Sequence, residues 1–319
     1  MNTETGSLVE RRTRAVKARA QALGFDACGV AQAGEIEPED RLGAWLAQGH
    51  NADMGWLACT KELRQDPRAL LPGARSVVVV ASNYYAARPA TERPGGRVSR
   101  YAWGRDYHRV LRKPLRDLTD FVIGLEDGAQ AHQSIDTGPI AECAWASRAG
   151  VGWIGKNALL IRQDAGSWVF LGVILTTVAL VPDTPAANRC GTCRRCIDAC
   201  PTGAIIAPGV VDARRCIAYH TIENRKAIPE DLQPLFGDWV FGCDVCQEVC
   251  PWNSNARETS FRDFHPRPGH ASLDLEGLDA IDETTFKKRF AGSPIRRATL
   301  SGMQRNACIV ARNLEASAP

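Results

Sequence analysis

Cysteine is the residue whose spacing points most directly to chemistry in this chain. Eight of the twelve cysteines lie within 61 residues: Cys190, Cys193, Cys196, Cys200, Cys216, Cys243, Cys246 and Cys250. The first run has gaps of two, two and three residues, and both runs end in a Cys-Pro step, at Pro201 and Pro251. This is the spacing of bacterial ferredoxins, in which three thiolates bind one 4Fe–4S cube and the fourth reaches a second cube.

The spacing therefore predicts two 4Fe–4S clusters with interleaved ligands. The first cluster is assigned to Cys190, Cys193, Cys196 and Cys250, and the second to Cys200, Cys216, Cys243 and Cys246. Structural zinc would take paired cysteines in fours, which leaves the third cysteine of each run and both Cys-Pro steps unexplained. Disulfides are disfavoured because no apolar secretory segment begins the chain, and the radical-SAM spacing Cys-x3-Cys-x2-Cys does not occur.

Composition sets the compartment and restricts the partners. The net charge is only +3, so composition alone does not indicate a nucleic-acid partner. No stretch of eighteen uncharged apolar residues is present, and the longest apolar run, 168–181, is too short to span a bilayer. We expect a cytoplasmic monomer without a membrane segment, in a compartment where thiols stay reduced.

The elements around the cysteines indicate an α/β (α+β) architecture. Apolar residues recur at helical spacing in several segments, whereas two β-branched runs are typical of buried strands. Helices are predicted at 7–23, 40–48, 113–125, 139–150 and 302–314, and strands at 25–30, 77–81, 158–162 and 168–181. We predict a catalytic domain over residues 1–181, a ferredoxin-like domain over 182–255 and a short helical, basic segment over 256–319.

Motifs alone do not say what the larger domain holds. No glycine-rich dinucleotide loop follows a strand, and no P-loop occurs. Asp106 and His108 begin the Asp-x-His-x-x-Gly pattern that places a histidine under cobalt, but Leu111 stands where glycine is required. We therefore interpret His108 as a packed or loop histidine rather than a cobalt ligand.

A resemblance to a known family goes further. The stretches GPIAECAWASRAGVGWIGKNALLI (138–161), GSWVFLGVILT (166–176) and RYAWGRDYH (100–108), with Asp136 and the eight cysteines, resemble the epoxyqueuosine reductases. The similarity runs from the first helix to about Leu314. It implies a cobalamin-binding catalytic domain beside the two clusters, and removal of the epoxide oxygen from epoxyqueuosine at the wobble position of tRNA. An external low-potential electron donor and base-off cobalamin are also implied.

The same resemblance implies roles for individual residues. Asp136 matches the proton donor, and we expect an apolar corrin face to raise its pKa. Cobalamin contacts are expected from Trp56, Leu57, Arg100, Tyr101, Asp136, Leu160, Phe170, Leu171, Val173, Cys243 and Asp244. Contacts with tRNA are expected from Tyr219, Arg225, Lys226, Arg296 and Arg297, because wobble bases are splayed out and phosphates are held by Lys and Arg.

Other interpretations stay open at this point. Asp136 could simply cap the following helix, and the aromatic residues of 168–170 could be strand packing. The chain could also be a corrinoid reductive dehalogenase, or a two-cluster electron carrier without a catalytic centre. Many members of the family continue into a helical-repeat region, of which residues 256–319 resemble only the first part, so we expect a smaller tRNA footprint.

Overall fold

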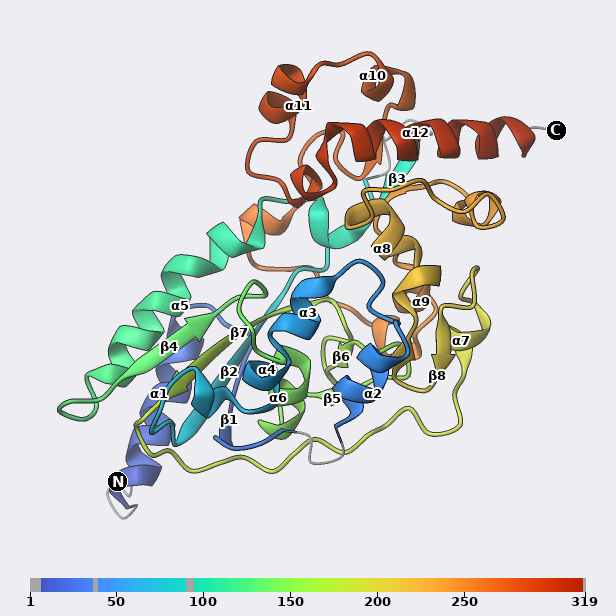
Figure 1. Ribbon diagram of the computed structural model, residues 1–319. Coiled ribbons are helices and arrows are strands. Elements are labelled where there is room, and N and C mark those ends of the chain that lie inside the picture. The colour runs from blue at the N-terminus through green and yellow to red at the C-terminus, as the bar shows by residue number, and fades with distance from the viewer. Residues whose placement is uncertain (1–6, 37–39, 90–94, 318–319) are drawn as a thin grey trace.

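The computed structural model describes residues 7–36, 40–89 and 95–317. Its centre is a four-stranded antiparallel sheet with the strand order β1-β2-β7-β4 (Figure 1). The strands are β1 (Ala27–Gln32), β2 (Ser76–Asn83), β4 (Ala131–Ser134) and β7 (Val169–Thr176). Every residue of β2 is buried, as the continuous apolar run at 77–81 predicted for a strand covered on both faces.

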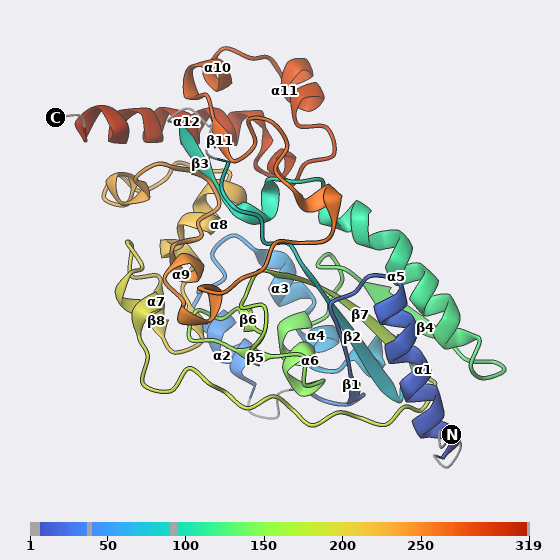
Figure 2. The same ribbon diagram turned by 180° about the vertical axis from the view of Figure 1, so that it is seen from behind.

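Alternate side chains of β2 enter two separate cores. Val78 and Val80 pack against helices α1 (Leu8–Ala22) and α5 (Tyr107–Ile123). Val77 and Val79 face helix α6 (Glu142–Arg148) on the other side, because successive strand residues point to opposite faces. Figures 1 and 2 show α1 and α5 beside each other on one face of the sheet and α6 on the opposite face.

Two local signals position the first helix and the helix nearest the site. Ser7 caps α1 through a capping box with Glu10, as its place before the apolar periodicity indicates. Asp106 caps α5 by accepting from the backbone of His108. Helix α5 therefore begins six residues before the predicted start at residue 113, and its first turn carries Tyr107 and His108. The N-cap residue Asp106 marks this earlier start, whereas hydrophobic periodicity alone does not.

The cysteine segment is built from two short, similar units. Each has a four-residue helix that stops directly before a Cys-Pro step: α7 (Arg195–Asp198) and α9 (Val245–Glu248), which pack against each other. Proline cannot continue a helix, so the last cysteine of each run is turned back toward the loop. The hairpin β8 (Ile205–Ala207) and β9 (Val210–Val211) and helix α8 (Ile217–Ile222) lie between the two units.

A second, three-stranded sheet joins segments far apart in the chain. Strand β3 (Gly96–Val98) pairs with β10 (Trp239–Phe241) on one side and β11 (Ser272–Leu273) on the other. Its core is completed by α10 (Leu275–Asp279), α11 (Glu283–Arg289) and α12 (Thr299–Ala316). Helix α12 contains the predicted helix at 302–314. The three segments predicted as consecutive domains therefore interleave in space.

The remaining elements surround the site. They are α2 (Arg41–Ala47), α3 (Gly55–Cys59), α4 (Lys61–Gln65), β5 (Trp153–Ile154) and β6 (Leu160–Ile161). The predicted strand at 158–162 is thus only two residues long, in a hairpin with β5. Within the described ranges, no helix has both the length and the apolar character needed to cross a bilayer.

Candidate active site

Four thiols lie together at the edge of the cysteine segment, and we call them the outer cysteine group. They are Cys190, Cys193, Cys196 and Cys250. They line a cavity of about 70 Å³, and Cys196 is close enough to Cys250 and Cys190 for their charges to raise its pKa, in addition to the effect of burial. Lys156 fixes their loop by donating to the carbonyls of Gly191 and Cys193, at 2.8 Å each.

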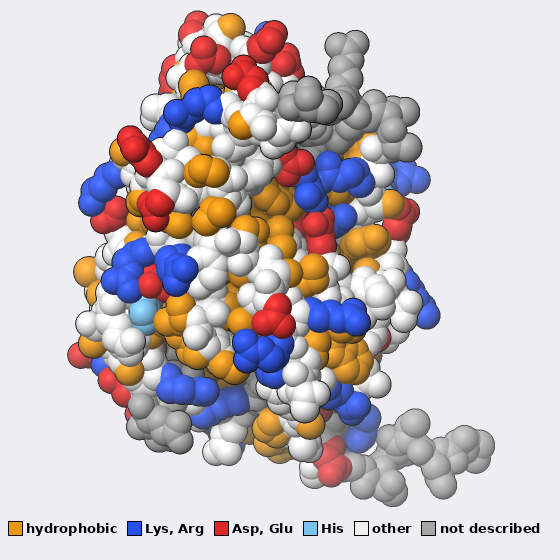
Figure 3. Space-filling view, turned by 90° about the vertical axis from the view of Figure 1, so that its right-hand side faces the viewer, with side chains coloured by type: hydrophobic (Ala, Val, Ile, Leu, Met, Phe, Trp, Pro, Cys, Tyr) orange, Lys and Arg blue, Asp and Glu red, His pale blue; other side chains and the backbone are white. Residues whose placement is uncertain are grey.

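The outer cysteine group belongs to the face that α7 and β8 form on the right of Figure 1. Figure 3 shows hydrophobic side chains, cysteine included, in the middle of this face, with Lys and Arg in separate groups around them. Three arginines beside the outer group, Arg189, Arg194 and Arg195, are exposed. The outer group is therefore the one within reach of a partner in solution.

The other four thiols form the inner cysteine group. They are Cys200, Cys216, Cys243 and Cys246, and all of them line a cavity of about 480 Å³. Burial, and then the charges of Cys243, Cys216 and Asp244, raise the pKa of Cys246 well above its ordinary value. The structure thus brings the eight cysteines together in the same two sets into which their spacing divided them.

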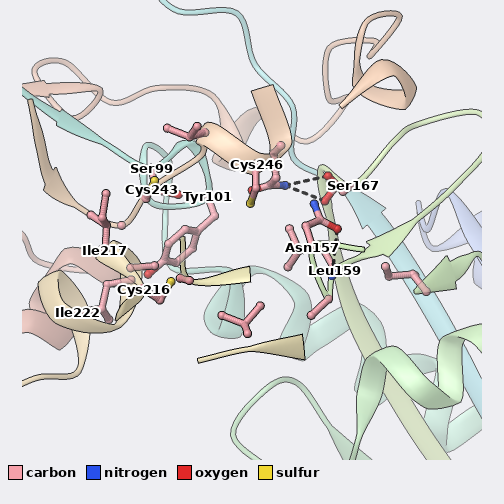
Figure 4. Close-up of a pocket in the computed structure, with 18 of the residues that line it drawn as sticks. Ser99, Tyr101, Asn157, Leu159, Ser167, Cys216, Ile217, Ile222, Cys243 and Cys246 are labelled. Carbon is pink, nitrogen blue, oxygen red and sulfur yellow. Dashed lines mark hydrogen bonds between the residues drawn. The ribbon is translucent and has the colours of Figure 1, made fainter. Parts of the chain in front are cut away.

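The cavity beside the inner group has mainly hydrophobic walls, and we call it the apolar cavity. Its walls include Tyr101, Leu160, Phe170, Leu171, Ile217 and Ile222. Figure 4 shows Tyr101 beside Cys216, with Ile217 on one side of Tyr101 and Asn157 and Leu159 on the other. The Asn157 amide nitrogen is buried in this wall without a hydrogen-bond partner among the described residues. A buried donor of this kind indicates a missing acceptor.

Asp136 lies where the apolar cavity meets a second cavity. It follows β4 and has a φ of 58°, a left-handed conformation that non-glycine residues adopt mainly at functional sites. Its Oδ2 accepts from the Tyr107 hydroxyl at 2.8 Å and lies 3.4 Å from His108 Nε2. Its backbone N–H donates to Glu142 Oε1 at 2.6 Å. Asp136 is therefore held at the junction of the two cavities by a loop in a left-handed conformation.

The ionisation of Asp136 differs from the sequence-based expectation. Burial raises its pKa, as predicted, but the hydrogen bonds from His108 and Tyr107 outweigh burial and leave the pKa below its ordinary value. The neighbouring Glu142 behaves in the opposite way. Burial, and then the charge of Asp136, raise its pKa to about 8. The environment thus shifts the pKa values of the two carboxyl groups in opposite directions.

The second cavity is larger and carries charge, and we call it the polar cavity. It has a volume of about 820 Å³, and its walls include Trp56, Arg64, Asp136, Glu223, Arg296 and Arg297. Trp56 is 43% exposed, and the guanidinium of Arg297 lies 5.6 Å from its ring centre. Arg297 also pairs with Glu223 at 2.9 Å. An exposed aromatic ring beside arginines suits a splayed base and its phosphates.

Several predicted cofactor contacts lie elsewhere. Trp56 and Leu57 line the polar cavity instead of the apolar one. Val173 is fully buried in the core between the sheet and α6, on the same face of β7 as Leu171 but two residues further along the strand, beyond the cavity wall. Of the eleven predicted positions, Tyr101, Asp136, Leu160, Phe170, Leu171 and Cys243 line the apolar cavity.

Arg100 and Asp244 are structural and do not contact either cavity. Asp244 is 1% exposed and accepts from the Arg100 backbone at 2.7 Å and from the hydroxyl of Ser99. The Arg100 side chain donates to the carbonyl of Ala86 at 2.9 Å and stacks over Trp168. These two side chains join the β3 segment to the cysteine segment, and a cofactor contact from the backbone at 243–244 stays a prediction.

Three predicted tRNA contacts are occupied within the protein. Tyr219 is 7% exposed, and its hydroxyl pairs with Asp53, so little of its side chain is accessible to tRNA. Lys226 pairs with Asp53 at 2.9 Å. Arg225 donates to the carbonyls of Ile222 and Arg297. Arg296 is exposed in the wall of the polar cavity, as expected for a phosphate contact.

Sequence reasoning missed four residues at the centre of the site. They are Tyr107, His108, Glu142 and Asn157. The interpretation of His108 as a packed or loop histidine was incomplete, because it faces Asp136 from the first turn of α5. The N-cap signal of Asp106 could have placed Tyr107 and His108 at a helix start, but only the fold brings that turn to Asp136.

Comparison with known proteins identifies the class and then the family. Residues 189–253 match the family model described as a 4Fe-4S double cluster binding domain, which indicates an iron–sulfur protein of the two-cluster class. Residues 64–137 match the model described as epoxyqueuosine reductase QueG, DUF1730.

Among curated proteins, the epoxyqueuosine reductase of Synechocystis sp. is 48% identical over 88% of this chain and 98% of its own length. That of Gloeobacter violaceus is 47% identical over 92% of this chain and 93% of its own length. The chain belongs to the epoxyqueuosine reductase family.

Solved structures of this family have the same fold. A crystal structure of epoxyqueuosine reductase with an epoxyqueuosine-modified tRNA-Tyr stem loop matches with a TM-score of 0.87 at 32% identity, over 96% of this chain and 83% of that one. The Bacillus subtilis enzyme, with its catalytic aspartate loop swung out of the active site, matches with a TM-score of 0.88 at 31% identity, with the same coverage of both chains.

Proposed function

We propose that this protein reduces epoxyqueuosine to queuosine at the wobble position of tRNA. Family membership gives the reaction class, and one observation carries the assignment to this site. Asp136 lies at the junction of the apolar cavity, which the inner cysteine group lines, and the polar cavity, which carries Trp56, Arg296 and Arg297. The reducing centre in one cavity and the substrate in the other can therefore meet beside the same carboxyl group.

The two cysteine groups supply the electron path in this proposal. The outer group would hold one 4Fe–4S cluster, and an external low-potential donor could reach it, because its loop is at the surface beside three exposed arginines. The inner group holds the second cluster in the wall of the apolar cavity. Cysteine ligands must stay reduced until the clusters are loaded, which is the condition of the cytoplasm. The protein acts there as a monomer.

The apolar cavity fits the corrin ring of cobalamin. Its hydrophobic walls suit a large flat macrocycle, and the unpaired amide of Asn157 can donate to one of the ring's amide side chains. Tyr101, Leu160, Phe170, Leu171 and the backbone at Cys243 would hold the ring. When bound in its base-off form, cobalamin supplies the strongly reducing centre that this chemistry needs.

Asp136 is the proposed proton donor to the oxygen that leaves the epoxide. It lies at the boundary of both cavities, and Tyr107 and the backbone bond to Glu142 fix its orientation. A positioned acid of this kind is worth roughly 10²–10⁴ in rate. The polar cavity holds the anticodon loop, with Trp56 available to stack on a base and Arg296 and Arg297 available to phosphates.

The direct test is conversion of a modified tRNA. Anaerobic protein loaded with iron, sulfide and cobalamin is mixed with epoxyqueuosine-containing tRNA and a low-potential reductant, and nuclease digests are analysed by mass spectrometry. Loss of one oxygen mass from the modified nucleoside is the expected result. Two clusters without corrin retention, and unchanged tRNA, would instead indicate an electron carrier and would disprove the proposal.

A further inference from the structure

Three side chains form a line that ends at Asp136. Asp106 Oδ1 lies 2.8 Å from His108 Nδ1, and His108 Nε2 lies 3.4 Å from Asp136 Oδ2. The second contact is an ion pair, because Nε2 is buried and has no hydrogen bond of good geometry among the described residues. The imidazole thus has one nitrogen fixed by a carboxylate and the other directed at the proposed proton donor.

The imidazole is held in place from several sides. Its backbone N–H and its Nδ1 both contact Asp106 Oδ1, and its ring stacks on Tyr107 with centres 4.1 Å apart. Tyr107 is itself stacked on Phe170 at 4.2 Å and donates to the same Asp136 oxygen. A carboxylate behind a histidine fixes its orientation and stabilises its protonated form, as in hydrolase triads.

The proposed reaction consumes more than one proton per epoxide. Removing an epoxide oxygen as water, with formation of a carbon–carbon double bond, consumes two electrons and two protons. The electrons come from the low-potential donor through the clusters. One proton goes to the oxygen when the first carbon–oxygen bond breaks, and the second goes to it when the second bond breaks and water leaves. Asp136 has a lowered pKa and is ionised at neutral pH, so each proton that it delivers must first reach it from another group.

We propose that His108 is the proton reserve of this site and passes its proton to Asp136, which delivers it to the departing oxygen. Asp106 orients the imidazole and compensates its charge. His108 acts through Asp136 and is a positioning residue, with no contact to substrate required. The inference rests on the proposed function and extends it to the source of the proton that Asp136 delivers.

The charges that face His108 agree with this role. Burial lowers its pKa, but the hydrogen bond with Asp106 and the negative charges of Asp106 and Asp136 outweigh burial and raise the pKa to about 9. The other charged and titratable groups around it are Arg64, Tyr101, Tyr107, Arg109, Glu142, Glu223 and Arg297. The imidazolium is therefore present at neutral pH and is lost as pH rises through about 9.

Glu142 is the competing reserve, and its geometry argues against it. Its Oε1 accepts from the backbone N–H of Asp136, and no hydrogen bond joins the two carboxyl groups among the described residues. It therefore holds the strained loop rather than the reacting oxygen. Glu142→Gln keeps an acceptor for this bond but removes the acidic proton, so its kcat is compared directly with that of His108→Gln.

The test compares His108→Gln and Asp106→Asn with a matched control, His132→Gln, on β4 and outside both cavities. In the loaded enzyme, His108→Gln is expected to lower kcat by roughly 10- to 100-fold near pH 8 with little change in KM for tRNA. The unchanged protein should keep a constant kcat between about pH 6 and 8. The variant should lose kcat continuously over this range, since Asp136 must then be reprotonated from water.

A second readout does not depend on turnover. The ring of His108 is titrated by NMR in the full chain with its clusters oxidised, and its signal is assigned by its loss in His108→Gln. An apparent pKa above the ordinary 6.5 that falls in Asp136→Asn and in Asp106→Asn is expected. A titration at the ordinary value that neither variant moves would overturn the inference, as would a His108→Gln enzyme with unchanged kcat and pH profile.

The two readouts separate the possible failures. If the loaded wild-type protein does not convert epoxyqueuosine, the proposed function fails. The NMR titration still decides whether His108 stores a proton against Asp136. If tRNA is converted but Glu142→Gln lowers kcat as His108→Gln was expected to do, while His108→Gln is silent, the reserve is Glu142 and this inference is wrong.

Discussion

The apolar and polar cavities are neighbours with opposite chemistry. Both have Tyr101, Tyr107, Asp136 and Ile222 in their walls. Beyond this boundary, one cavity continues into hydrophobic side chains and four thiols, and the other into arginines and an exposed tryptophan. The difference suits two separate tasks. The hydrophobic cavity suits reducing chemistry in a site of low polarity, and the adjoining charged cavity suits binding of a polyanion.

The sharpest way to break this comparison is to remove an inner thiol. Cys246→Ser is expected to abolish turnover with any reductant, because the inner group lines the apolar cavity. Cys193→Ser in the outer group should lose turnover with a protein donor and keep part of it with a small chemical reductant. Turnover is measured by mass analysis of tRNA digests, and iron content shows whether one cluster remains. Equal loss in both variants, each with one cluster intact, would contradict the assignment.

The next largest effect is expected at the boundary itself. Asp136→Asn should lower kcat by about 10²–10⁴, because the proton donor is lost while the side chain keeps its size. Cluster content, corrin retention and KM for tRNA should change little, since neither cavity is altered. Retained turnover would remove Asp136 from its role, and loss of corrin or tRNA binding would show that the residue holds one cavity together.

A charge reversal tests the polar cavity alone. Arg296→Glu is expected to weaken tRNA binding about tenfold at low salt and less at high salt, because each lost phosphate contact reduces the salt dependence. Corrin retention should be unchanged. Lys226→Gln is the matched control, since Lys226 already pairs with Asp53. Filter binding at two salt concentrations measures both variants, and an equal effect of the two would place the phosphate contacts elsewhere.

The smallest effect is expected in the apolar cavity. Asn157→Ala removes the unpaired donor, and we expect cobalamin affinity to fall about five- to tenfold, the value of one hydrogen bond of roughly 1–1.4 kcal/mol. Affinity for tRNA should not change. Absorbance titration of the cluster-loaded protein with cobalamin measures the first, and filter binding the second. A variant with unchanged cobalamin affinity would mean that this amide does not meet the ring.

The parts of the site that could be predicted from sequence are those that act locally. The thiols are grouped by gaps of two and three residues and by two Cys-Pro steps, so the sequence divides them into the sets that the fold brings together. The buried strand β2 and the capped helix α1 follow from equally local patterns.

The cavity walls could not be predicted in the same way. They draw on segments from residue 84 to residue 247, and their side chains are ordinary hydrophobic ones. Whether a β7 residue lines the cavity depends on how far along the strand it lies, since Val169, Phe170 and Leu171 line it and Val173 does not. Phe170 and Val173 therefore looked equivalent in sequence. His108 was missed for a related reason, because its place in the site depends on its contact with Asp136, which is 28 residues away in the chain.

The position of β3 also has a consequence for the time at which the protein can fold. This strand is made early, at residues 96–98, but its neighbours are β10 at 239–241 and β11 at 272–273. Chains are synthesised at about 5–20 residues per second, so β3 waits for several seconds without partners. The ribosome must deliver most of the chain before this sheet closes beside the cysteine segment. Completion of the sheet, and with it the final enclosure of the clusters, is therefore a late step in the life of the nascent chain.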